Sequence, residues 1–342
     1  MSGDAQVARL GEPFGHGKVI LLGEHAVVYD QPALAAGLSR GLAAVAIPGT
    51  GRLTVPAWAL DVNARDASSP VARAYAAILA ALGAADLDVT VKADLPARAG
   101  LGSSAAFAIS IARAVARARG APSDAATILA AATEAEKVFH GTPSGIDLAA
   151  ASSGEVGRFE RATGWRPVKV LQPMTLCVGL SGRARDTHAQ VAAVRRLRER
   201  TPGVRAVIET MGALVVEGER ALGRGDIDEL GRLLDVAHGL LAALRVSTGE
   251  LEALVHTARE AGAVGAKLTG AGGGGAVIAL APGHERDVLR RWNEAGFQGF
   301  VATIGANGAN DDEDGKKDGK KSGKDDRIAG GVQGPAKETS PS

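Results

Sequence analysis

A loop rich in glycine and serine joins two segments of different pattern, and its residue types suit an anion. Residues 88–93 alternate apolar and polar side chains, which predicts a half-buried strand, and residues 105–119 are rich in alanine, which predicts a helix. The first N–H groups of a helix attract anions, and glycine lets a phosphate approach the backbone closely. We therefore expect a phosphate site at Gly100, Leu101, Gly102, Ser103, Ser104 and Ala105. In the alternative interpretation, a serine only caps the helix.

Three ionisable residues lie close together in an apolar segment near the start of the chain. Lys18 begins the run Lys-Val-Ile-Leu-Leu, which predicts a buried strand, and Glu24 and His25 follow it. Charge in apolar surroundings is costly without a partner, so this grouping favours a site for an anionic ligand. The alternative is a strand end at which the three side chains are solvated.

One carboxylate stands on the apolar side of an expected helix. Residues 123–139 predict a helix with Ser123 as N-cap, and their apolar side chains form one stripe. Glu136 projects into this stripe, whereas Glu134 points to the opposite side. A carboxylate on an apolar face needs a cation, so Glu136 is either a metal ligand or half of a salt bridge with an arginine.

The segment His140-Gly-Thr-Pro-Ser-Gly-Ile-Asp147 has the composition of a fixed loop. Asp147 ends the loop just before a run of small residues. Its carboxylate is therefore either a helix cap or a catalytic group.

A second glycine-rich loop, 266–275, precedes the apolar segment 276–280. Gly270, Gly272 and Gly275 satisfy G-x-G-x-x-G, but a strand follows where a dinucleotide site requires a helix. We therefore expect this loop to pack closely against a phosphate or another backbone. The motifs of P-loop NTPases and of protein kinases are missing from the sequence.

The amino-acid composition and charge of the chain exclude several classes of protein. Hydrophobic residues make up 46% of the 342 residues, and 39 basic residues balance 38 acidic ones. This balance indicates neither a nucleic-acid partner nor an anionic membrane surface. The single cysteine, Cys177, excludes an intrachain disulfide, and we find neither a signal peptide nor an apolar run long enough to span a membrane. We expect a cytoplasmic protein without a membrane partner.

The remaining patterns predict the elements that position these residues. We expect strands at 34–45, 53–55, 168–171, 175–180 and 299–304, and helices at 70–82, 187–200, 204–223, 227–244, 250–262 and 282–296. The second half of the chain has the pattern of a separate α+β unit. We expect one domain at 1–165 and another at 166–304. Residues 305–342 are Asp, Lys, Gly and Asn blocks with few apolar residues, which predicts a disordered tail.

Four motifs occur in an order that resembles the GHMP kinases, a family of small-molecule kinases. They are Gly17-Lys-Val-Ile-Leu-Leu-Gly-Glu-His-Ala-Val-Val-Tyr, Gly-Leu-Gly-Ser-Ser-Ala-Ala, His-Gly-Thr-Pro-Ser-Gly-Ile-Asp and Lys-Leu-Thr-Gly-Ala-Gly-Gly-Gly-Gly. The resemblance covers about residues 14–304. It implies an α+β fold with a ribosomal-protein-S5-like amino-terminal domain and a ferredoxin-like carboxy-terminal domain, with the site between them.

The form Gly-Glu-His-Ala-Val-Val resembles the branch of the family that acts on mevalonate. This resemblance implies phosphorylation of the C5 hydroxyl of mevalonate by ATP, with Mg²⁺ held by Ser104 and Glu136. Asp147 is then the base, with Lys18 beside it. The nucleotide contacts are expected at the phosphate loop, Gly270 and Gly272, and the substrate contacts at Glu24, His25, Ser144 and Thr187.

Two positions depart from this branch of the family. Gly15-His16 replaces Ala-Pro, and Asp30 stands where glycine is common. These departures leave open another GHMP kinase that acts on phosphomevalonate or a sugar. A ligand sensor of the same fold and a decarboxylase relative are further alternatives, and the sequence leaves a homodimer open.

Overall fold

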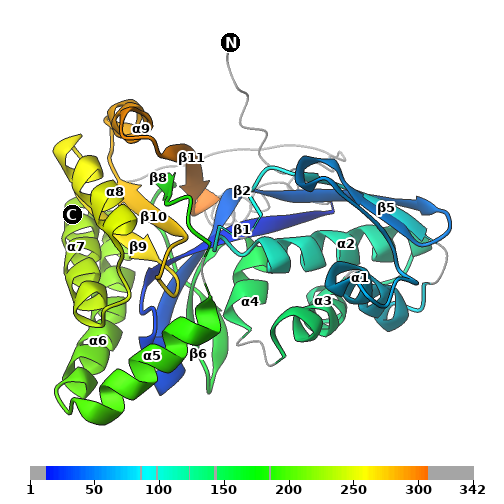
Figure 1. The fold of residues 1–342 in the computed structure, drawn as a ribbon, viewed down its shortest axis with the longest axis horizontal. Helices are drawn as coiled ribbons and strands as arrows, with labels where there is room; N and C mark the ends of the chain where they lie inside the picture. Colours follow the sequence, from blue (N-terminus) through cyan, green and yellow to red (C-terminus); the bar gives the residue numbers. More distant parts are fainter. Residues whose placement is uncertain are drawn as a thin grey trace, which may run out of the picture. The chain divides into compact units, whose positions relative to one another are not determined.

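The protein was analysed as a computed structural model, which describes residues 13–84, 87–97, 99–122, 124–141, 145–184 and 186–306. The described residues form a seven-stranded sheet and a four-stranded sheet, with helices packed on them (Figure 1). The first sheet has the order β4-β3-β5-β2-β6-β7, and β1 pairs with β2. Its strands are β1 (Phe14–Leu22), β2 (Ala33–Pro48), β3 (Arg52–Val55), β4 (Leu60–Asn63), β5 (Leu87–Ala93), β6 (Val156–Glu160) and β7 (Gly164–Pro167).

Four helices accompany the first sheet: α1 (Pro70–Ala81), α2 (Ser103–Arg119), α3 (Ala125–His140) and α4 (Ile146–Ser153). Small residues let α2 approach the strands closely, because a Cβ on Gly15 of β1 would lie 2.1 Å from the carbonyl oxygen of Ala106. The buried face of α2 is made mostly of alanine, isoleucine and valine. The low aromatic content is therefore compensated by short distances between backbones.

The second sheet is antiparallel, with the order β11-β8-β10-β9. Its strands are β8 (Met174–Leu180), β9 (Gly265–Thr269), β10 (Ala276–Leu280) and β11 (Gln298–Ile304). The helices of this half are α5 (Thr187–Arg200), α6 (Val204–Arg224), α7 (Ile227–Ala243), α8 (Gly249–Glu260) and α9 (Glu285–Glu294). Trp292 of α9 is fully buried, and its indole Nε1 donates to the carbonyl of Leu254 at 2.8 Å. This bond fixes α9 against α8.

Side-chain hydrogen bonds join the two sheets. Thr269 Oγ1, at the end of β9, accepts from the backbone N–H of Ile20 at 2.9 Å and donates to the carbonyl of Ile20 at 3.0 Å. The N–H of Thr303 in β11 donates to Ser39 Oγ of β2 at 2.9 Å. The elements that carry the motifs are thereby held in one packed body. The expected division at residues 165 and 166 stays a prediction; β7 ends at Pro167 and the next strand, β8, belongs to the second sheet.

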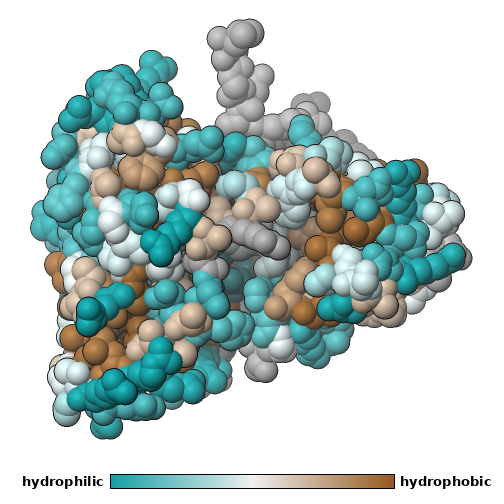
Figure 2. All heavy atoms as spheres, in the orientation of Figure 1, coloured by the Kyte–Doolittle hydropathy of each residue, from teal (hydrophilic) through white to brown (hydrophobic). Residues whose placement is uncertain are grey.

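The surface over α9 carries mainly hydrophilic residues on the face drawn in Figure 2. No helix in the described part of the chain is long and apolar enough to cross a membrane. Among larger apolar side chains, Val45 and Ile47 of β2 are exposed.

Most expected elements are present, with three differences. Residues 168–171 form no strand, although Val168 is buried and donates its N–H to the carbonyl of Val156 at 2.9 Å. Helix α3 has Asp124 as its N-cap, and Ser123 lies outside the described residues. Strands β4, β6 and β7 and helix α4 were not predicted. The expected tail lies outside the described residues from residue 307 onward.

Candidate active site

The amino-terminal strand brings a buried lysine to a carboxylate at the start of α4. Lys18 of β1 is 3% exposed, and its Nζ lies 2.9 Å from Asp147 Oδ1. The N–H of Lys18 also donates to the carbonyl of Leu101 in the phosphate loop, at 2.8 Å. The loop, the lysine and the carboxylate, which are far apart in sequence, are thus adjacent in space.

Asp147 does not cap its helix. Gly145 is the N-cap of α4, in the left-handed region at φ 88°, and Asp147 lies in the first turn. The Asp147 side chain is 39% exposed. The helix-cap interpretation is therefore wrong, and a partly accessible carboxylate stands beside a buried ammonium group.

The start of α2 has the geometry of an anion site. Its N-cap is Gly102, at φ 71°, and no side chain caps the helix. The serine-cap interpretation is therefore wrong, and the hydroxyls of Ser103 and Ser104 stand in the first turn of the helix. A Cβ on Gly102 would lie 2.6 Å from Lys18 Cγ, so glycine lets the loop pass directly over the lysine. The helix dipole and Lys18 together favour negative charge at this point.

Glu136 is buried beside a hydroxyl and an imidazole. Glu136 is 3% exposed, as the apolar stripe predicted, and the Ser104 hydroxyl opposes the rise of its pKa. His140 Nε2 lies 3.8 Å from Glu136 Oε2 and 3.4 Å from Ser104 Oγ. Burial raises the pKa of Glu136 to about 7; Asp147 adds to this rise, whereas Ser104 and Lys18 oppose it. Burial also lowers the pKa of His140.

The donor set at Glu136 fits a hard divalent cation. Glu136 Oε1 is buried and has no hydrogen-bond partner among the residues that the structure describes. Within the described residues no arginine forms an ion pair with Glu136, so the arginine salt bridge is not found. One carboxylate and one hydroxyl next to a phosphate site are the oxygen ligands that Mg²⁺ accepts while it keeps several waters.

The turn after β1 holds the other two ionisable residues. Glu24 is 1% exposed and His25 is 5% exposed, so the interpretation as solvated charges at a strand end is wrong. His25 adopts a left-handed φ of 59°, and its Nε2 lies 2.9 Å from the carbonyl oxygen of Ala271. The short helix η1 (Ala26–Tyr29) follows the turn. Their expected contact with the substrate stays a prediction.

The second glycine-rich loop packs against backbone. A Cβ on Gly272, at φ 75°, would lie 2.3 Å from the carbonyl oxygen of Val246, and Gly270 also has a positive φ. The loop thus passes between the His25 turn and the connection from α7 to α8. Close approach to another backbone is confirmed, and a contact of Gly270 or Gly272 with a nucleotide stays a prediction.

The remaining predicted positions are less closely connected to this cluster. Thr187 is the first residue of α5, after the N-cap Asp186, and Ser144 lies outside the described residues. His16 Nδ1 lies 2.9 Å from the carbonyl oxygen of Leu38, and Asp30 has a left-handed φ of 60°, which glycine would adopt without strain.

Sequence reasoning missed two residues beside the site. His140 is the last residue of α3, and its position four residues after Glu136 places both on one face of the helix. Lys267 of β9 is fully buried and forms an ion pair with Glu24. A lysine within a strand of apolar residues was the available signal for the second.

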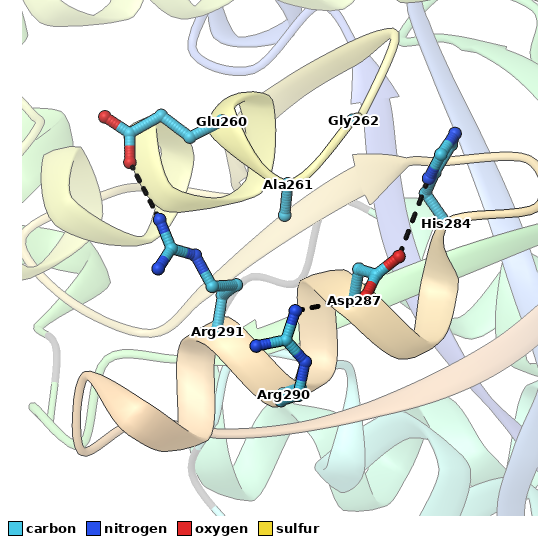
Figure 3. A pocket seen from close by; sticks show the side chains of 7 residues that line it. All are labelled: Glu260, Ala261, Gly262, His284, Asp287, Arg290 and Arg291. Carbon is cyan, nitrogen blue, oxygen red and sulfur yellow. Dashed lines mark hydrogen bonds and ion pairs between the residues drawn. The ribbon is translucent and has the colours of Figure 1, made fainter.

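A cavity of about 410 Å³ lies elsewhere, between the end of α8 and α9 (Figure 3). Its arginines Arg290 and Arg291 are paired with acidic residues on the same helices, among them Asp287 and Glu260. None of the predicted site residues lines it.

Comparison with known proteins agrees with this geometry. Residues 69–155 match the GHMP kinases N terminal domain, and residues 219–298 match the GHMP kinases C terminal domain. The chain is 35% identical to the mevalonate kinase of Aeropyrum pernix over 328 residues, covering 90% of this chain and 99% of that protein. It is 34% identical to the mevalonate kinase of Pyrococcus horikoshii, with 86% and 96% covered.

A solved structure is similar over nearly the same length. The mevalonate kinase of L. major in complex with R-mevalonate superimposes with a TM-score of 0.77 at 28% identity, covering 89% of this chain and 98% of that one. Fold and site together define a small-molecule kinase of α+β architecture. The chain belongs to the GHMP kinase family.

Proposed function

We propose that this protein transfers the γ-phosphoryl group of ATP to the C5 hydroxyl of mevalonate. The observation that carries the proposal is the 2.9 Å contact of Lys18 Nζ with Asp147 Oδ1 beside the start of α2. The mevalonate kinases that resemble this chain over nearly their whole length support the choice of alcohol.

Asp147 is the base. Its half-exposed carboxylate accepts the proton of the attacking hydroxyl, which makes that oxygen a better nucleophile. The Lys18 ammonium beside it stabilises the negative charge that develops on the attacking oxygen and on the phosphoryl group. Phosphoryl transfer depends on such charge stabilisation and in-line positioning more than on covalent chemistry.

The start of α2 binds the phosphates of the nucleotide. The backbone N–H groups of its first turn and the positive end of its dipole face the Gly100–Gly102 loop. Ser104 and Glu136 would hold Mg²⁺ near this point, because Glu136 Oε1 is buried without a partner among the described residues and Ser104 interacts with the same carboxylate. When bound, the ion would neutralise part of the phosphate charge. His25, Ser144 and Thr187 are assigned to the substrate side.

A panel of alcohols tests the proposal. ADP release is measured with (R)-mevalonate, phosphomevalonate, galactose and homoserine, each with ATP and Mg²⁺. We expect kcat/KM to be highest for mevalonate by at least about 100-fold, because the alternatives leave buried polar groups unpaired. A higher value for another alcohol would keep the fold but reject the substrate. Nucleotide binding without turnover of any alcohol would favour a ligand sensor.

A further inference from the structure

A buried ion pair joins β9 to the turn after β1. Lys267 in β9 and Glu24 in the turn after β1 are 243 positions apart, and the Lys267 ammonium contacts Glu24 Oε1. Both side chains are 0% exposed. Lys267 Nζ also donates to the carbonyl of Leu268 at 2.7 Å. No step of the mechanism above uses Lys267.

Stability alone is a poor explanation for this pair. Two charges that leave water lose hydration free energy, and their mutual attraction compensates for this loss only in part. Apolar residues of similar volume often stabilise a core equally well. Burial accordingly lowers the pKa of Lys267, and the attraction of Glu24 opposes that shift. Buried ion pairs are better attested as devices that fix one arrangement of segments.

The surroundings show which segments are fixed. Strand β9 runs directly into the glycine-rich loop 270–275, and the turn that carries Glu24 also carries His25. The two segments meet again where His25 Nε2 approaches the carbonyl of Ala271 and where Thr269 Oγ1 bonds both backbone groups of Ile20. Lys267 lies at this junction and supplies its charged contact.

The carboxylate of Glu24 is engaged on one side only. Oε1 accepts from Lys267, whereas Oε2 is buried and has no hydrogen-bond partner in the described part of the chain. Lys267 therefore determines how this carboxylate is oriented. Since its Oε1 is bound to Lys267, Glu24 can influence the substrate side through the position of its turn.

We propose that Lys267 is a positioning residue for phosphoryl transfer. Its ion pair with Glu24 holds the turn that carries His25 against the glycine-rich loop, in the place where the alcohol must lie. The inference rests on the proposed function and deepens it, because it assigns Glu24 to an internal partner and not to a contact with mevalonate.

A double-mutant cycle tests this inference. Lys267→Met, Glu24→Gln and the double variant are compared by kinetics and by calorimetric binding of mevalonate, with Lys92→Met, an exposed lysine of β5, as the control. We expect each single variant to raise the KM and Kd for mevalonate about tenfold, and the double variant no more than either single, because both remove one contact. The KM for ATP stays within about threefold, because the phosphates bind at α2.

Folding is followed in the same variants. Lys267→Met leaves a buried carboxylate without its partner, so it melts at a lower temperature than the double variant, which retains no buried charge from the pair. If Lys267→Met does not fold, the KM of the double variant for mevalonate tests the positioning role. A raised mevalonate KM in a stable double variant supports the positioning role, and a wild-type KM in that variant overturns it.

The outcomes separate this inference from the proposed function. If the wild-type protein neither binds nor phosphorylates mevalonate, both the proposed function and the positioning role of Lys267 are wrong. If the wild type is active but the Lys267→Met or Glu24→Gln variant keeps the wild-type KM for mevalonate, only the positioning role of Lys267 is wrong. Additive effects of the two substitutions would also overturn it, because they would show that the residues act independently.

Discussion

In the proposed reaction, Lys18 and Asp147, whose side chains are in contact, have separate roles. Asp147 would accept the proton and Lys18 would stabilise charge, and neither residue lies in the first turn of α2, the proposed site of the nucleotide phosphates. Replacing Asp147 by asparagine should therefore lower kcat by about 100-fold to 10,000-fold and leave the Kd of the nucleotide near wild type. Turnover assays and calorimetry measure the two quantities. Unchanged turnover would remove Asp147 from the role of base.

The buried carboxylate of Glu136 leads to a prediction of how the stability of the protein depends on pH. Its pKa is about 7 in the folded protein, above the ordinary value of 4.5, so the folded state keeps its proton over a range in which the unfolded state has lost it. Without Mg²⁺, the wild type should lose about 3 kcal/mol of stability between about pH 4.5 and 7, whereas Glu136→Gln should not.

Urea unfolding in the presence of a chelator, repeated across this pH range, measures the difference. Added Mg²⁺ and ADP should flatten the wild-type curve, because the ionised carboxylate then has a partner. Parallel curves for the two proteins would mean that Glu136 ionises as an ordinary glutamate does.

Some of the site could be predicted from residue patterns, and some could not. The helical period alone placed Glu136 on a buried face, because its neighbours at that spacing are apolar. The sequence identified Lys18 and Asp147 separately but gave no sign from pattern alone that they touch, since such a contact depends on how β1 and α4 pack. The partnership of Lys267 with Glu24 was missed for the same reason.

Two glycines at the ends of α2 allow the effects of two alanine substitutions to be compared. Gly102 and Gly120 flank the helix, both with positive φ, at 71° and 61°. A Cβ at Gly102 would lie 2.6 Å from Lys18 Cγ, whereas a Cβ at Gly120 would have no atom of the described residues within 4 Å. Either alanine substitution should cost about 1–2 kcal/mol of stability, the cost of a left-handed conformation.

Only Gly102→Ala should also impair the reaction, because it displaces the lysine and the loop. We expect its KM for ATP to rise at least about tenfold and its kcat to fall, and Gly120→Ala to keep both values. Steady-state kinetics and melting curves of the two variants distinguish the effects. Equal kinetics in both would show that the loop tolerates a side chain beside Lys18.

Regular elements were predictable where the pattern was long and periodic. Helix α5 begins and ends at the predicted residues 187 and 200, and α1 ends one residue early. The predicted strand at 168–171 was wrong because only Val168 of this segment is buried, whereas Leu171 is 58% exposed, and the segment forms no ladder with a neighbouring strand. Strands β6 and β7 were missed because they are short and carry polar residues such as Arg158 and Arg166.

At the scale of the whole molecule, the general architecture followed from the resemblance of four motifs and not from the patterns of individual elements. Patterns along the chain indicated an α+β second half, but the order of strands within each sheet depends on pairings between distant segments. The junction at Thr269 and Ile20, which joins both sheets beside the site, is an example of such a pairing.

The charged end of the chain leads to a prediction about the whole protein. The residues after Gly305 include few apolar side chains, a composition that predicts too little buried surface to offset the loss of conformational entropy on ordering. Deleting them should leave kcat/KM at the wild-type value and the melting temperature within about 2 °C. Calorimetry of the shortened chain measures this. A larger fall in melting temperature would show that this segment contributes to packing.

The identity of the phosphorylated product shows directly whether this protein phosphorylates the C5 hydroxyl of mevalonate. Purified protein is incubated with (R)-mevalonate, ATP and Mg²⁺, and the products are followed by phosphorus and proton nuclear magnetic resonance, with Asp147→Asn in parallel. We predict one phosphate monoester on the C5 oxygen for each ADP formed, and almost none with the variant. ADP without a new ester, an ester at another oxygen, or full product formation by Asp147→Asn would contradict the account.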